Sequence, residues 1–219
     1  MALRDFAGDG LFTAYSDEPN WQPAHDLLRA AFARAAMLRY HPIMLAAASE
    51  LFDSWDDQEG PVDVSRDMTK LTLETISRTA FSRDFGSFTL KDAHPFVPAM
   101  VASLRAGQRK GVLNAMPGSG LLARRLSRRH SHHQTYVDSL IDDLIAQRRR
   151  DNDLDDRDLL GIMVSTAHPG SGQRLTDRNI RYQILTFWVA VMRDVWCALL
   201  RALLPLPRPR RACRGAGRD

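Results

Sequence analysis

Trp21 and His25 are the residues whose types and spacing fit the binding of an anion. They lie four residues apart in a segment of helical periodicity, which places both side chains on one helical face. Indole and imidazole N–H groups are hydrogen-bond donors, so the two rings could hold one carboxylate together. A packed tryptophan beside a surface histidine has the same spacing, and the spacing alone leaves both interpretations open.

Three other groups of residues suggest a site but fit a structural explanation better. His130, His132 and His133 carry metal-binding rings, yet the arginines around them oppose a cation, so we expect a solvated helix start or loop. The acidic run 151–158 lacks the glycine and the terminal glutamate of an EF-hand loop and predicts a solvated connector. Residues 8–10 read Gly-Asp-Gly without the third glycine or the preceding strand of a phosphate loop, and predict a turn.

Charge is distributed unevenly along the 219 residues. Residues 1–190 carry 23 basic and 24 acidic side chains, whereas residues 191–219 carry seven arginines and two aspartates. The body is therefore close to neutral and only the tail is basic, which argues against a nucleic-acid-binding face.

Cysteine content and hydropathy indicate the compartment. Cys197 and Cys213 are the two cysteines and form neither a disulfide framework nor a zinc-ligand spacing. The first ten residues contain no apolar signal region, so we expect a cytoplasmic protein. The longest apolar run, 184–206, is interrupted by charges that each cost on the order of 3 kcal/mol inside a bilayer, which excludes a membrane span.

Helical periodicity dominates the chain and predicts a mainly α protein. We expect a helix over 17–37 with Ser16 as N-cap and an irregular start, because Pro23 would also have to fit its first turn. Further helices are expected over 43–55 after a restart at Pro42, over 66–81, from Pro95, over 121–150, over 158–167, and from Thr176 as N-cap. Residues 168–175 predict a surface loop or a short hairpin. The helix after Thr176 becomes apolar on nearly every face by Ile184, which indicates a central buried helix. The side chains predicted to face inward are Met68, Leu71, Ile76 and Phe81, and Tyr136, Leu140, Leu144 and Ile145.

Four segments, in order and with matching spacing, resemble the cytochrome P450 family. They span residues 4–32, 67–85, 94–104 and 155–187. The resemblance covers almost all of residues 3–190 and is to the bacterial fatty-acid hydroxylases that are fused to an NADPH–P450 reductase carrying FAD and FMN. It implies the part of the P450 fold that runs roughly from helix C to the start of helix I.

The resemblance also implies roles for particular residues. Trp21 and His25 match the Trp-x-x-x-His whose N–H groups hold a heme propionate in this family. Phe12 matches the aromatic that overhangs the heme and steers the substrate, although a core position fits Phe12 as well. On the same loop, Ala7 and Leu11 are implied as further substrate contacts. Ala190 matches the alanine of the oxygen-binding helix and is the third implied heme-binding residue.

The expected family pattern stops after Ala190. The central helix of the family reads Ala-Gly-x-Glu/Asp-Thr, but residues 190–194 read Ala-Val-Met-Arg-Asp. No Glu-x-x-Arg occurs among the 219 residues. Residues 211–215 copy the Arg-x-Cys-x-Gly around the heme-ligating cysteine, but Leu206 and Pro209 replace the required phenylalanine and glycine. We therefore reject Cys213 as the axial ligand, and expect neither a catalytic residue nor a metal ligand in this chain.

A shifted reading frame accounts for this departure. Residues 194–207 have a back-translation that, read one base later, encodes TSGALSFALYYL, which is how the family's central helix continues. We thus predict a partial heme domain over 1–190 and a frameshifted basic tail over 191–219; resequencing that finds no alternative frame would contradict this.

The function implied by the resemblance is that of a heme-thiolate monooxygenase acting on fatty acids, in a fragment without activity of its own. Two alternatives remain. One is a non-catalytic helical module that binds an apolar ligand. The other is a non-functional pseudogene product that folds poorly because the helix around Ile184 lacks its partners.

Overall fold

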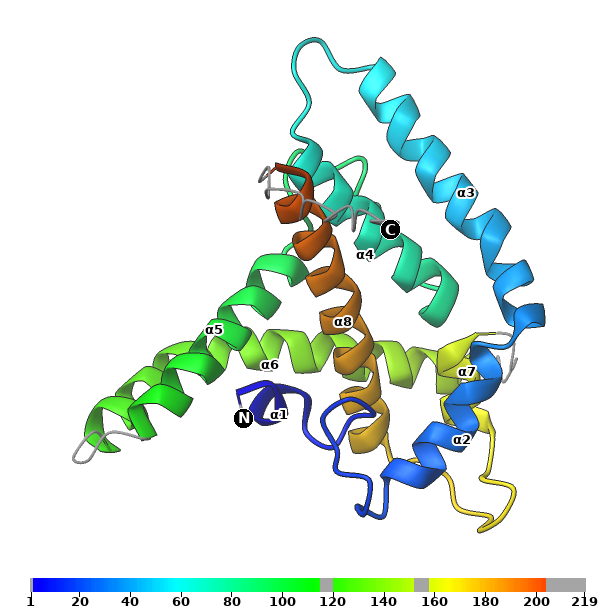
Figure 1. Ribbon diagram of the computed structural model, residues 1–219, viewed down its shortest axis with the longest axis vertical. Coiled ribbons are helices and arrows are strands. Elements are labelled where there is room, and N and C mark those ends of the chain that lie inside the picture. Colours follow the sequence, from blue (N-terminus) through cyan, green and yellow to red (C-terminus); the bar gives the residue numbers. More distant parts are fainter. Residues whose placement is uncertain (1, 115–119, 152–157, 204–219) are drawn as a thin grey trace, which may run out of the picture.

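The computed structural model describes residues 2–114, 120–151 and 158–203, in which eight α-helices and no strand occur (Figure 1). The predicted mainly α class is confirmed. Residues 204–219, which include Cys213, lie outside the described part. The helices are α1 (Ala2–Ala7), α2 (Trp21–Ala31), α3 (Arg34–Asp56), α4 (Val64–Phe81), α5 (Phe96–Asn114), α6 (Gly120–Arg150), α7 (Leu159–Ser165) and α8 (Asp177–Leu203).

Helix α8 runs through the middle of the molecule (Figure 1). It packs against α1, α4, α6 and α7. Ile180, Ile184, Leu185 and Trp188 are completely buried, which confirms the prediction of a central buried helix for this stretch. The helix around Ile184 therefore has its partners within the chain, contrary to the premise of the poor-folding alternative.

Trp188 is the centre of an aromatic cluster that joins three helices. Its ring centroid lies 4.3 Å from that of Phe96 on α5, 5.1 Å from that of Phe81 on α4 and 6.1 Å from that of Phe85. The indole Nε1 of Trp188 donates a hydrogen bond to Ser77 Oγ at 3.3 Å. Tilted and edge-on rings at these separations contribute attraction beyond the area that they bury.

Side-chain caps begin three of the helices. Asp63 and Asp158 accept hydrogen bonds from the backbone N–H groups of Arg66 and Gly161, at 3.0 and 2.6 Å, at the starts of α4 and α7. Thr176 Oγ1 accepts from the backbone N–H of Asn179 at 3.2 Å, which confirms the predicted cap of α8. Each cap satisfies an N–H that has no partner inside its own helix.

The predicted N-cap of α2 at Ser16 is wrong, whereas the irregular start expected from Pro23 is found. The helix begins at Trp21 rather than after Ser16, and residues 16–20 form turns. Glu18 forms an ion pair with Arg4, and Asn20 Nδ2 donates a hydrogen bond to Asp9 Oδ2 at 2.6 Å. These contacts hold the segment against the N-terminal loop and outweigh its local helical preference.

The predicted break at Pro42 is also wrong, because α3 continues through this residue. A proline inside a helix leaves the carbonyl four residues earlier without a donor. That residue is Leu38, whose side chain is 66% exposed, so water can reach this face of the helix. The same solvent-facing surface of α3 carries the exposed side chains of Met37, Leu38, Met44, Leu45 and Phe52.

The inward faces of α4 and α6 were predicted in part. Phe81 is buried as expected, but Met68, Leu71 and Ile76 are half-buried. Leu73, which was not predicted, is completely buried. On α6, Leu144 and Ile145 are buried, Leu140 is half-buried, and Tyr136 is 38% exposed. Val137 and Ile141, which were not predicted, are completely buried on this helix, which packs against α5, α7 and α8.

Replacing Trp188 tests the central cluster. We expect W188A to lower the free energy of unfolding by about 3–5 kcal/mol, since the change removes a completely buried ring and leaves a cavity. Urea unfolding followed by far-UV circular dichroism measures this. The control L45A, at a side chain that is 57% exposed, should change stability by less than about 1 kcal/mol. Equal effects of the two changes would contradict the assignment of the core.

Candidate functional site

The loop between α1 and α2 is fixed against the side of α8. The backbone N–H of Leu11 donates to Gln183 Oε1 at 2.8 Å, and Gln183 Nε2 donates to Asn179 Oδ1 at 3.1 Å. Asn179 Nδ2 in turn donates to Asp9 Oδ1 at 3.2 Å. A Cβ atom at Gly10 would lie 2.1 Å from Thr186 Oγ1, so this close approach requires glycine. The loop therefore presents its next residues beside α8.

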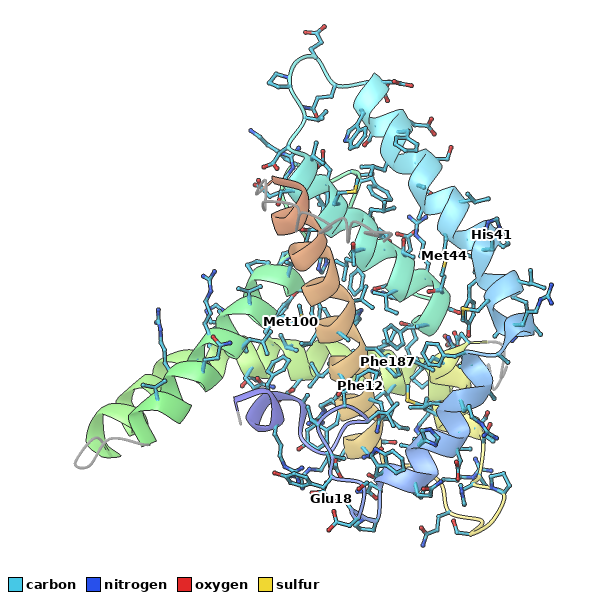
Figure 2. All side chains as sticks on the ribbon, viewed as in Figure 1. Phe12, Glu18, His41, Met44, Met100 and Phe187 are labelled. Carbon is cyan, nitrogen blue, oxygen red and sulfur yellow. The ribbon has the colours of Figure 1, made fainter. Side chains whose placement is uncertain are left out.

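Phe12, Phe32 and Phe187 form an aromatic wall at this junction. The ring centroid of Phe187 on α8 lies 6.0 Å from that of Phe12 and 5.6 Å from that of Phe32. Phe187 is buried, whereas Phe12 and Phe32 are 62% and 54% exposed. Figure 2 shows Phe12 and Phe187 together at the centre of the molecule. Phe12 is thus a surface residue that backs onto the core.

The remaining residues of the implied substrate loop and the oxygen-binding helix lie near this wall in the sequence. Ala7 is completely buried at the end of α1, and Leu11 is half-buried against the hydrophobic core. Ala190 is half-buried on α8, three residues after Phe187. Their roles in binding a ligand stay predictions.

Trp21 and His25 stack on each other at the start of α2. Their ring planes are 9° apart, with centroids separated by 4.9 Å. Both residues are half-buried. Within the part of the chain that the structure describes, no side chain or backbone group accepts a hydrogen bond from Trp21 Nε1 or contacts His25 Nε2 by one. Trp21 Nε1 can therefore donate to an added acceptor, and His25 Nε2 is free to contact an added group.

Trp21 and Phe32 lie at opposite ends of α2. Trp21 is the first of the 11 residues of α2 and Phe32 directly follows the last, which corresponds to about 16 Å along the helix axis. Helix α2 is fixed between these ends by the buried side chains of Ala24, Leu27, Leu28 and Ala31. The site thus has a polar end at the Trp21–His25 pair and an apolar end at the aromatic wall.

Asp26 stands beside the polar end and was not anticipated from the sequence. Its carboxylate accepts from Gln22 Nε2 at 3.0 and 2.9 Å and contacts His25 Nδ1 at 3.3 Å and His168 Nε2 at 3.2 Å. These hydrogen bonds, the one from Gln22 first, lower the pKa of Asp26 to about 2. Nothing local in the sequence indicates the partner 142 residues away.

Of the other candidates from the sequence, the side chain of His130 and residues 152–157 of the acidic run lie outside what the structure describes within 2–114, 120–151 and 158–203. His132 and His133 are exposed on α6. Across these ranges no three His, Cys, Asp or Glu side chains come together in an arrangement that could hold a metal ion. Within the same ranges, no helix has the length and hydropathy needed to cross a membrane.

The arrangement of the helices matches part of the cytochrome P450 fold. The structure is similar to a solved cytochrome P450, CYP102L1, with a TM-score of 0.78 and 34% sequence identity over 89% of this chain and 44% of that one. The sequence model of the cytochrome P450 family matches residues 2–207. The chain belongs to the cytochrome P450 family.

The curated relatives are longer proteins. The bifunctional cytochrome P450/NADPH–P450 reductase 2 of Bacillus subtilis is 38% identical over 193 residues, and the self-sufficient cytochrome P450 monooxygenase CYP505E3 of Phanerodontia chrysosporium is 40% identical over 198 residues. These matches cover 86% and 87% of this chain, but only 18% of each relative. The family match extends past Ala190, and the boundary expected there stays a prediction.

Removing Gln22 tests the contacts of Asp26. The pKa of Asp26 lies below its ordinary value, so this carboxylate stabilises the fold above about pH 4 and loses that contribution as the pH falls toward 2. We expect Q22A to raise the pKa of Asp26 toward 3.8, which a ¹³C NMR titration of its carboxyl carbon measures. The control Q58A, on the C-terminal side of α3, should leave the titration unchanged. An unchanged titration in Q22A would show that Gln22 does not hold the carboxylate.

Proposed function

We propose that residues 1–190 are part of the heme domain of a fatty-acid-hydroxylating monooxygenase and that Trp21 and His25 bind a heme propionate. The observation that carries this is the stacked ring pair with two available nitrogens, in a chain of the cytochrome P450 family. A carboxylate only accepts hydrogen bonds, and the indole nitrogen only donates them. The chemistry of the pair thus fits a propionate.

The aromatic wall supports an apolar substrate. Two half-exposed rings over the buried Phe187 offer a surface without charge, on which a hydrocarbon chain gains from leaving water. Bound heme would supply the activation of dioxygen, and an NADPH–P450 reductase would supply electrons, as the fused relatives suggest. Phe12 would then orient the chain, and the loop contacts with Gln183 and Asn179 would hold Phe12 in place.

The 219-residue chain itself is proposed to lack monooxygenase activity. Its sequence contains neither the Glu-x-x-Arg pattern nor the complete cysteine-loop pattern that the family resemblance requires. Residues 191–194 replace the glycine and threonine expected in the oxygen-binding helix. Residues 191–219 are proposed to be a frameshifted product.

Hemin titration tests the propionate site. We expect W21F, which keeps an aromatic ring but loses the N–H donor, to bind hemin about 10- to 100-fold more weakly than the unchanged chain. This follows from about 1.5–3 kcal/mol for a hydrogen bond to a charged group. The control ligand is hemin dimethyl ester, whose propionates carry no charge; its binding should be insensitive to W21F. Equal affinity of both proteins for hemin would contradict the site.

The reduced carbon-monoxide spectrum tests the second part of the proposal. We expect the 219-residue chain, reconstituted with hemin, to show no Soret band of the thiolate-ligated type, because the ligand-loop pattern is incomplete in its sequence. Cys213→Ser should leave the spectrum unchanged. A thiolate-type band that disappears in C213S would overturn the rejection of Cys213.

A further inference from the structure

Asp26 joins two parts of the chain that are distant in sequence. Its first oxygen contacts Gln22 Nε2 and His25 Nδ1 on the same helix, at 3.0 and 3.3 Å. Its second oxygen contacts Gln22 again, at 2.9 Å, and His168 Nε2 at 3.2 Å. His168 lies in the loop after α7, so one carboxylate fixes the polar end of α2 to that loop.

The loop of His168 determines which of its ring nitrogens carries the proton. The backbone N–H of Ser171 donates to His168 Nδ1 at 3.1 Å, so Nδ1 is an acceptor. The loop is closed by backbone hydrogen bonds of 2.8 Å from His168 N to Gln173 O and from Gly172 N to His168 O. In a neutral ring with Nδ1 unprotonated, the proton is on Nε2. His168 therefore donates to Asp26 without needing a positive charge.

In His25 the nitrogen that contacts Asp26 is Nδ1, whereas in His168 it is Nε2. A carboxylate oxygen accepts only, so the His25 Nδ1 that faces Asp26 must carry a proton. In a neutral ring, His25 Nε2 is then an acceptor. An added carboxylate is also an acceptor, so it can bind Nε2 only after that nitrogen has gained a second proton.

Few charged groups compete for this ring. Among the described residues, Asp26 is the charged side chain in contact with His25, and Trp21 covers one face of the ring. Arg29 follows one turn later on α2 and is exposed. His168 reaches His25 only through Asp26. No ion pair from α3 or α7, the helices packed against α2, reaches His25 in the described structure.

We propose that Asp26 is a positioning residue that holds His25 with Nδ1 protonated, so that a carboxylate binding to the Trp21–His25 pair does so with the uptake of one proton from solvent onto His25 Nε2. The inference rests on the proposed propionate site for the identity of that carboxylate. Trp21 donates its own N–H regardless of pH, whereas His25 contributes only as the imidazolium between two carboxylates. The anchored His168 keeps Asp26 in place.

The tautomer of His25 is the first test and needs neither a ligand nor a variant that perturbs folding. ¹⁵N NMR of the histidine rings in the 219-residue chain near neutral pH, assigned by comparison with H25Q, distinguishes the two neutral forms. We expect the Nδ1–H form at His25 and the Nε2–H form at His168. In D26N, the new amide can donate to Nδ1, so we expect His25 to adopt the Nε2–H form. An Nε2–H tautomer of His25 in the unchanged chain would overturn the proposal.

Hemin affinity as a function of pH is the second test. Uptake of one proton on binding predicts an affinity for hemin that falls by up to about tenfold for each unit by which the pH rises. In D26N the expected Nε2–H form of His25 can donate to a carboxylate directly, so binding needs no proton uptake. The hemin affinity of the unchanged chain divided by that of D26N should therefore fall as the pH rises. D56N, a matched change at an exposed aspartate of α3, should behave like the unchanged chain. A ratio independent of pH contradicts the coupling.

The two proposals fail in different ways. If the unchanged chain binds hemin and its dimethyl ester equally, the propionate site is wrong, while an Nδ1–H tautomer of His25 would still support the pairing with Asp26. If hemin binds in preference to its ester but His25 is in the Nε2–H form, the propionate site stands and the positioning role of Asp26 is wrong.

Discussion

Burial of the apolar stretch of α8 is the constraint on which the other elements depend. Ile180, Ile184, Leu185 and Trp188 are completely buried, and a helix can bury side chains on so many faces only when other elements surround it. Helices α1, α4, α6 and α7 supply that surrounding. Because successive residues of an α-helix point about 100° apart, Trp188 faces the core while its neighbour Phe187 faces the aromatic wall. One helix therefore organises both the core and the apolar end of the site.

Helix α2 relates the two ends of the site in the same way. One face packs Ala24, Leu27, Leu28 and Ala31 into the core, which leaves Trp21 and His25 on a half-buried face near its start. The residue after its last turn, Phe32, reaches the aromatic wall. The polar and apolar ends are thus held at a fixed separation by a single rigid element. This geometry suits the proposed binding of an amphipathic group such as heme beside an apolar substrate.

The solvent-facing side of α3 is apolar and exposed, unlike the buried apolar side chains of α8. It carries five large apolar side chains, among them Leu38 and Phe52, at 66% and 56% exposure. Figure 1 shows α3 along the outer side of α4. The chain covers 44% of the solved P450 chain to which it is similar. Exposed apolar area of this kind costs free energy in water, whereas Ile180, Ile184, Leu185 and Trp188 of α8 are completely buried.

The sequence by itself determined the features that depend on neighbours within a few residues. These are the helical class, the cap at Thr176, the irregular segment after α7, the buried character of α8, and the placement of Trp21 and His25 on one face. Local hydrogen bonds and a period of 3.6 residues create these features, so composition and spacing are sufficient to predict them. Tertiary structure decided the rest. Contacts of Glu18 with Arg4 and of Asn20 with Asp9 delay the start of α2. Packing of the folded chain also brings together the three rings of the aromatic wall and places Asp26 against His168. These contacts join segments that only the folded chain brings together, and their energies outweigh the local preferences that the sequence displays.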